Sequence, residues 1–170
     1  FSPIAKATAA CSGNAPTSGT WNWGDGATQA WGGVGTSVQH SFAAKGTYVI
    51  SLMVTNVGGS SPATQAVNVY NPVAITSFTC TPATGTTPLA VACTGVTTGD
   101  MWTADIAWGD AGNSHTFASS GSFTFNVATT QTFTIQLTVT GLGGGSAARS
   151  ATVTVYPQFI LPPVAAFTAA

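Results

Sequence analysis

The sequence predicts an all-β chain of two tandem β-sandwich domains, and three observations carry this prediction. Residues 23–25, Trp-Gly-Asp, recur as residues 108–110, and the run 47–55 recurs as 132–140, both at an offset of 85. Within 132–140, apolar residues alternate with Thr and Gln, which is the period of a half-buried strand. No stretch shows a sustained helical period. Two copies of this size are typical of small all-β domains.

The expected strands are runs rich in Thr, Val, Phe and Tyr, separated by clusters of Gly, Asn and Ser. In the first copy they are 4–11, 20–24, 37–42, 47–55 and 64–70. In the second copy they are 74–81, 89–94, 103–108, 122–128, 131–140 and 148–156. We expect the first sandwich over residues 1–70, the second over 71–156, and a linker with a separate strand over 157–170.

The composition limits the classes of function that the chain could have. Charged residues make up 4% of the 170 residues and the net charge is −1, which excludes a protein that binds nucleic acid by neutralising phosphates. No apolar run approaches the roughly 20 residues that span a bilayer, so we expect no transmembrane segment. Two His and four Asp residues offer few acid–base groups. We therefore expect neither an enzyme nor a cofactor.

Four motifs of the first copy occur in order: Trp21-Asn22-Trp23-Gly24-Asp25-Gly26, His40-Ser41-Phe42, Gly46-Thr47-Tyr48 and Val54-Thr55-Asn56. Together they resemble the PKD domain, an immunoglobulin-like β-sandwich. The segment from Pro72 looks like the start of a second such domain, so the resemblance covers essentially the whole chain. The second copy departs from the pattern at Ala111, which replaces the second glycine of the turn, and at Phe125, which the offset of 85 places at His40.

The repeated motif also has physical roles that do not depend on the resemblance. Trp21 and Trp23 share a strand face, so both can enter one core. Ile106 and Trp108 repeat this arrangement in the second copy. Asp25 and Asp110 follow in a turn, where a carboxylate accepts backbone N–H bonds. Calcium is the alternative, but it requires six to eight oxygens and each loop supplies one carboxylate. We therefore expect no metal site, and we expect His40 to be structural.

The two copies differ at their beginnings. The second copy opens with two strand segments, 72–81 and 88–93, whereas the first matches the second of these alone, with Cys11 aligned to Cys93. The opening strand of the first copy is thus expected to be missing. The exposed acceptor strand would carry Ile4, Ala5, Ala7, Ala9 and Cys11.

The C-terminal segment resembles the missing strand. The donor residues are expected to be Pro163, Val164, Ala165, Ala166, Phe167 and Thr168. The preceding Phe159, Ile160 and Leu161 are expected to pack against the recipient. An unpaired strand edge and an isolated strand would satisfy each other by β-strand addition between copies. A head-to-tail contact that does not close gives a filament.

These features favour a structural subunit of an extracellular filament or cell-surface array, with copies of the same chain as partners. One alternative is that the strand comes covalently from a preceding domain of a longer array. Another is a spacer or glycan-binding module of a secreted adhesin or hydrolase, using Trp31 or Trp102. A third is a virion decoration or tail protein.

The three cysteines indicate an oxidising compartment. Cys80 and Cys93 are expected on neighbouring strands at comparable depth, so a disulfide is favoured over two buried thiols. Cys11 is left as either a buried thiol, which we favour, or the partner of a cysteine in another chain.

Overall fold

The computed structural model describes residues 4–159, and every regular element in that part of the chain is a β-strand. The all-β prediction is therefore confirmed. The chain divides into two compact units, the first with the residues up to Pro72 and Gly141–Gly145, the second with Val73–Thr140 and the residues from Ser146 on. We call them unit 1 and unit 2 and describe each by itself.

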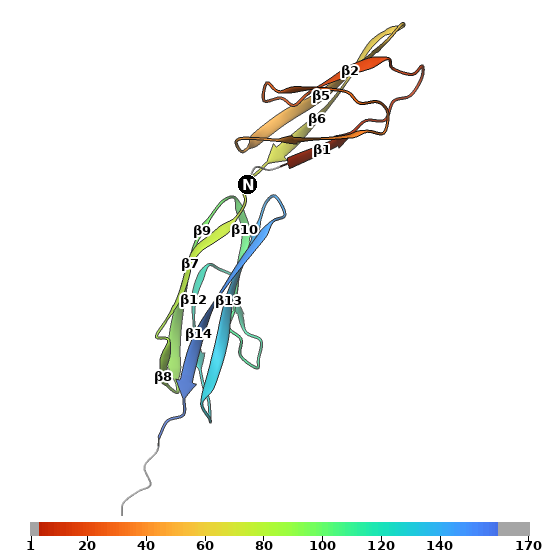
Figure 1. The fold of residues 1–170 in the computed structure, drawn as a ribbon. Coiled ribbons are helices and arrows are strands. Elements are labelled where there is room, and N and C mark those ends of the chain that lie inside the picture. The colour runs from red at the N-terminus through yellow and green to blue at the C-terminus, as the bar shows by residue number, and fades with distance from the viewer. Residues whose placement is uncertain (1–3, 160–170) are drawn as a thin grey trace, which may run out of the picture. The chain divides into compact units, whose positions relative to one another are not determined.

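Unit 1 is a sandwich of a two-stranded and a four-stranded sheet (Figure 1). Its strands are β1 (Ile4–Thr8), β2 (Ser18–Asn22), β3 (Thr28–Ala30), β4 (Ser37–Ser41), β5 (Gly46–Asn56) and β6 (Gly59–Val69). The small sheet pairs β1 with β4, and the large sheet has the order β3-β2-β5-β6. All of these pairs for which a register is defined are antiparallel.

The core of unit 1 lies between these sheets. Trp23 and Phe42 are almost fully buried, and Trp21, Ile50 and Leu52 are buried beside them. Three half-buried alanines pack against this core from alternate positions, Ala5 and Ala7 in β1 and Ala9 just after it. This face of the segment therefore lies toward the core, although its residues are small.

Unit 2 repeats this architecture with two additional strands. Its strands are β7 (Ala74–Thr81), β8 (Thr84–Thr86), β9 (Leu89–Thr98), β10 (Met101–Ala107), β11 (His115–Thr116), β12 (Ser120–Phe125), β13 (Gln131–Gly141) and β14 (Ser146–Tyr156). One sheet has the order β12-β9-β7 and the other has the order β11-β10-β13-β14-β8. The strand β8 runs parallel to β14, whereas β7 is antiparallel to β9.

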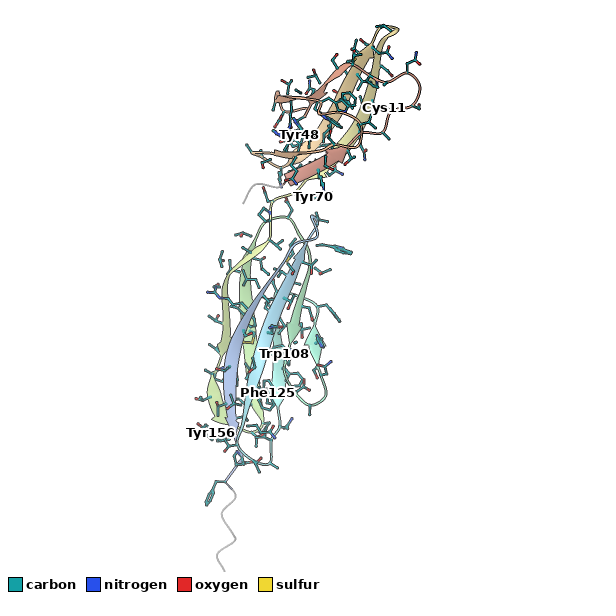
Figure 2. The ribbon with its side chains drawn as sticks, turned by 45° about the vertical axis from the view of Figure 1, so that its right-hand side comes forward. Cys11, Tyr48, Tyr70, Trp108, Phe125 and Tyr156 are labelled. Atoms are coloured by element: carbon teal, nitrogen blue, oxygen red, sulfur yellow. A yellow bond between two sulfur atoms is a disulfide. The ribbon has the colours of Figure 1, made fainter. Side chains whose placement is uncertain are left out.

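The core of unit 2 is larger than that of unit 1, because β7 adds Phe78 and Cys80 to it. Trp108 and Phe125 lie inside this unit (Figure 2). Cys80 and Cys93 face each other across β7 and β9 and form a disulfide.

Ring contacts correct the expected alignment of the two copies. His40 stacks on Trp23 with ring centroids 4.9 Å apart, and Phe123 stacks on Trp108 at 5.5 Å. Likewise Phe42 stacks on Tyr48, and Phe125 on Phe133. Phe123 therefore takes the place of His40, and Phe125 takes the place of Phe42. The expectation that Phe125 stands at His40 is wrong by two residues, because the second copy is two residues shorter before this strand.

The strand pairing also shows that Cys11 does not occupy the position that Cys93 has in unit 2. Ala7 pairs with Val38, four residues before Phe42, and Cys93 pairs with Gly121, four residues before Phe125. Ala7 is thus the counterpart of Cys93, and the expected alignment of Cys11 with Cys93 is wrong. Strand β1 ends at Thr8, so Cys11 lies beyond it.

Candidate functional site

The two units differ at the sheet edge that β7 occupies in unit 2. In that unit β9 has a partner on each edge, β12 on one side and β7 on the other. In unit 1 the equivalent strand β1 pairs with β4 alone, and residues 4–159 contain no counterpart of β7 in that sheet. One edge of β1 therefore presents backbone N–H and C=O groups without a strand partner in the described chain.

The extent of this edge can be defined by register. The residues of β9 that pair with β7 run from Ala92 to Thr98. With Ala7 as the counterpart of Cys93, their counterparts in unit 1 run from Lys6 to Ser12. An open groove of about 710 Å³ is lined by every residue of that segment. The hollow in unit 1 thus follows the edge that β7 covers in unit 2.

The opposite wall of the groove belongs to the other sheet. It is formed by β6 and the turn before it, from Gly58 to Gln65 together with Val67. These residues correspond to the part of β14 where the Arg149 side chain donates hydrogen bonds to the carbonyl oxygens of Ile75 and Thr76 in β7. Both walls of the groove therefore correspond to surfaces that hold β7 in unit 2.

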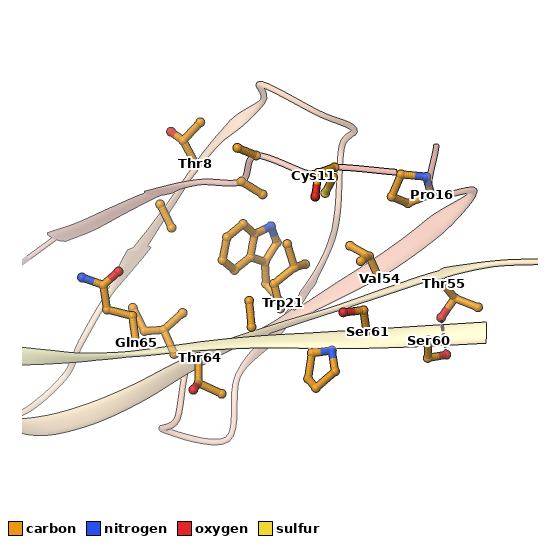
Figure 3. A pocket seen from close by; sticks show the side chains of 18 of the residues that line it. Thr8, Cys11, Pro16, Trp21, Val54, Thr55, Ser60, Ser61, Thr64 and Gln65 are labelled. Atoms are coloured by element: carbon orange, nitrogen blue, oxygen red, sulfur yellow. Dashed lines mark hydrogen bonds between the residues drawn. The ribbon is translucent and has the colours of Figure 1, made fainter. Parts of the chain in front are cut away.

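The floor of the groove is apolar. Trp21 and Val54 line it (Figure 3), together with Ile50 and Leu52. The indole ring of Trp21 lies between the two walls, and its Nε1 is buried without a hydrogen-bond acceptor among the described residues. A buried N–H without an acceptor costs roughly 1–3 kcal/mol. In unit 2 the counterpart of Trp21 is Ile106, which has no N–H in its side chain, and the indole Nε1 of Trp108, the counterpart of Trp23, donates to Thr116 Oγ1 at 2.9 Å.

The outer edge of β6 is also open. In unit 2 the end of β14 pairs with β8 through Thr154, Val155 and Tyr156. Strand β6 is the last strand of its sheet, so its corresponding end has no such partner among the described residues. Pro62 lies within β6, as suits an edge strand because proline has no N–H to donate.

The electrostatics of the groove are weak. Of the residues that line it, Lys6 alone carries a formal charge, and most of the polar groups on the rim are Ser, Thr, Asn and Gln. Such a groove favours an uncharged extended segment whose backbone can pair with β1. It offers little attraction for a highly charged ligand.

The turn aspartates lie elsewhere in the sandwiches and have structural contacts. Asp25 Oδ1 accepts the N–H of Ala27, and its Oδ2 lies 2.6 Å from His40 Nε2. The hydrogen bond with His40, followed by that from Ala27, lowers the pKa of Asp25 below its ordinary value of 3.8. Burial raises the pKa of Asp110, but hydrogen bonds from the backbone and hydroxyl of Ser114 outweigh it, and the net shift is downward.

A second carboxylate–imidazole pair lies in unit 2, where Asp105 Oδ2 is 2.8 Å from His115 Nδ1. Within residues 4–159, no group of three or more His, Cys, Asp or Glu side chains could hold a metal ion. Nor does that part of the chain contain a helix that could cross a membrane.

The remaining predicted residues are placed as follows. Cys11 is a free thiol and half-buried rather than buried, and it lines the groove. Phe159 is 84% exposed. Ile160, Leu161 and the donor residues Pro163 to Thr168 lie outside the described residues.

The two tryptophans outside the repeat differ from each other. Trp31 packs against the core of unit 1, where it is partly buried and its Nε1 is covered, so it is less suited than Trp102 to the glycan contact considered for both. Trp102 is 69% exposed. Sequence reasoning missed the Trp21 N–H, because a repeat predicts which rings are buried but not which ring atoms lack an acceptor.

The topology of two packed antiparallel sheets defines immunoglobulin-like sandwiches, and the sequence refines this class. Residues 4–71 match the sequence model of the PKD domain family, so the resemblance is confirmed over that segment. Domains of this kind are typically extracellular, non-catalytic modules.

Comparison with solved structures gives distant matches. The amphioxus IgVJ-C2 molecule has 15% identity and a TM-score of 0.44, over 89% of this chain and 96% of that one. The first four Ig domains of Dscam1 isoform 1.9 have 17% identity and a TM-score of 0.40, over 92% of this chain and 42% of that one. Fibronectin(III)-like modules of Clostridium thermocellum CbhA have 10% identity and a TM-score of 0.38, over 91% of this chain and 85% of that one. The chain thus spans less than half of the Dscam1 structure, and no curated protein matches its sequence significantly.

Proposed function

We propose that the chain is a structural subunit of an extracellular filament or surface array. Its subunits are joined head to tail, and the C-terminal segment of one copy enters the groove of unit 1 in the next copy. The observation that carries this proposal is the groove itself, which follows the end of β1 and the residues after it from Lys6 to Ser12, where the equivalent edge in unit 2 is covered by β7.

The occupant is argued from the chain's own sequence. Residues 163–168 resemble the start of β7, with Phe167-Thr168 repeating Phe78-Thr79. They carry no charged side chain, which suits the apolar floor and nearly neutral rim. Backbone carbonyls of an added strand are also the kind of acceptor that the Trp21 N–H lacks.

An added strand would stabilise unit 1 in two ways. An added strand satisfies the backbone groups of the β1 edge and covers the apolar floor, at about 25 cal/mol per Å² of apolar surface removed from water. The segment between Tyr156 and the donor residues contains two prolines, which limit its conformations and lower the entropy lost on docking.

Two variants test the proposal. One lacks residues 163–170 and so keeps the groove without the donor. The other carries a second copy of residues 160–170, with a short Gly/Ser linker, ahead of residue 1, so that the groove is filled within its own chain. We expect filaments from the wild-type chain by electron microscopy and none from either variant.

Mixing the two variants provides the matched control. The first has an open groove and the second a free donor, so they should form a one-to-one complex that does not grow further. Wild-type chains that stay monomeric at high concentration would overturn the proposal and favour a strand supplied by a preceding domain. Filaments from the truncated chain would overturn it equally.

A glycan-binding role is the second candidate, favoured by the exposed ring of Trp102. Exposed aromatic faces stack on sugar rings, and tryptophan is well suited to this contact. A glycan array with the wild-type chain and Trp102→Ala tests it, with Phe117→Ala, another exposed aromatic, as the control. Loss of a signal with the first variant alone would support this role.

A further inference from the structure

The strand addition proposed above leaves its register open, and the internal repeat supplies it. In unit 2, Phe78 pairs with Gly95 and Cys80 pairs with Cys93. Phe78 and Cys80 are both buried, so these two positions of β7 enter the core. The counterparts of Gly95 and Cys93 in unit 1 are Ala9 and Ala7.

Resting on the proposed function, we infer that the incoming strand runs antiparallel to β1 with Phe167 opposite Ala9 and Ala169 opposite Ala7. This register places Thr168 opposite Thr8, which repeats the pair of Thr79 with Thr94 in unit 2. It places Phe167 over the groove floor, where Leu52 is the counterpart of Leu137.

Both units have a small residue at the position under the phenylalanine of the added strand. In unit 2 it is Gly95, where an added Cβ would lie 2.2 Å from Leu137 Cδ2 and 3.6 Å from the Phe78 ring. In unit 1 it is Ala9, the smallest side chain after glycine, so Leu52 must be placed differently from its counterpart Leu137. A shift of one residue would turn Phe167 away from the core, because side chains alternate between the two faces of a strand.

The disulfide of unit 2 gives this register a direct test. If Ala169 takes the place of Cys80, then Ala7 and Ala169 of two copies lie as Cys80 and Cys93 do, with Cα atoms 4.1 Å apart. Cysteines at both positions should therefore cross-link neighbouring subunits under mild oxidation.

The experiment uses the full-length chain with Cys11→Ser, which removes the free thiol. The variant Ala7→Cys/Ala169→Cys should give a ladder of covalent multimers on a non-reducing gel. The register-shifted control Ala9→Cys/Ala169→Cys should give at least tenfold less. A ladder from the control in place of the test pair would overturn the register.

A second measurement does not depend on cysteine chemistry. Phe167→Ala should raise the critical concentration for filament assembly about 10- to 100-fold, because it removes a buried aromatic side chain. Thr168→Ala, on the opposite face of the strand, should change it by less than about threefold. Equal effects of both variants would contradict the register.

The outcomes separate the two proposals. If the truncated chain loses assembly but neither cysteine pair cross-links, the head-to-tail function stands and the register is wrong. If the wild-type chain does not assemble, the proposed function fails first. Far-ultraviolet circular dichroism of each variant identifies any that have not folded.

Discussion

His40 Nε2 lies 2.6 Å from Asp25 Oδ2, and the same imidazole stacks on the indole ring of Trp23. Through this contact the turn after β2 is joined to the end of β4, in the opposite sheet. In unit 2 the position of His40 is taken by Phe123, which keeps the ring stacking and loses the hydrogen bond to the turn carboxylate. One sandwich therefore uses a polar contact where the other uses an apolar one.

The first prediction concerns acid stability. Because the folded-state pKa of Asp25 is lowered, its contribution is present above the unfolded pKa near 3.8 and is lost as pH falls through the folded value. Asp25→Asn should therefore lower the melting temperature of unit 1 at pH 6, and the difference from wild type should shrink below about pH 4. Amide NMR signals of each unit during heating measure this. A difference that persists unchanged at pH 2 would contradict the argument.

The second prediction concerns the turn glycines. Gly24 and Gly26 both have positive φ, but an added Cβ at Gly24 would lie 2.7 Å from the Val49 carbonyl oxygen, and at Gly26 it would meet nothing. Gly26→Ala should destabilise unit 1 by about 1 kcal/mol through backbone strain alone. Gly24→Ala should cost about 1–3 kcal/mol more, because a backbone carbonyl must move. Urea unfolding gives both values, and equal costs would exclude the close contact.

The third prediction concerns the disulfide. Cys80→Ala/Cys93→Ala should destabilise unit 2 by about 3 kcal/mol, since the bridge closes a short loop in the unfolded chain. Unit 1 contains no disulfide among the described residues and provides an internal control. Hydrogen exchange followed residue by residue separates the two units. Equal loss of protection in both would show that the effect is not local to unit 2.

The fourth prediction concerns the Trp108 N–H. Thr116→Val removes its acceptor from a ring that is 1% exposed, so we expect a loss of about 1–3 kcal/mol in unit 2. Thr116→Ser keeps the hydroxyl and should cost less than half as much. Thermal unfolding of the two variants provides the measurement, since valine keeps the methyl group and lacks the hydroxyl whereas serine keeps the hydroxyl and lacks the methyl group. A serine variant as unstable as the valine variant would contradict the hydrogen bond.

The sequence predicts the large strands well because each has a repeated apolar period. Strand β13 was expected over 131–140 and spans Gln131–Gly141. The short strands β3, β8 and β11 were not expected, because two or three residues carry no measurable alternation. Strand β6 was expected from residue 64 and begins at Gly59, since its polar first half has no apolar face to signal it.

Alignment within the repeat was less reliable than the repeat itself. A constant offset assumes that loops keep their length, and the segment before β12 is two residues shorter than its counterpart before β4. Matching cysteine to cysteine likewise put Cys11 in the place that the ladder gives to Ala7. Register depends on which backbone groups pair across neighbouring strands. Matching residues of the same type in the sequence does not reveal that pairing.

By itself the sequence determined that two similar sandwiches follow one another and that Trp21, Trp23 and Trp108 of the repeated motif are buried, because periodicity and repetition are local properties of a chain. The tertiary structure alone decided that the segment Lys6–Ser12 borders a groove and that the Trp21 N–H lacks an acceptor there. Both depend on which strands from distant parts of the chain lie side by side, and on which edge has no neighbour.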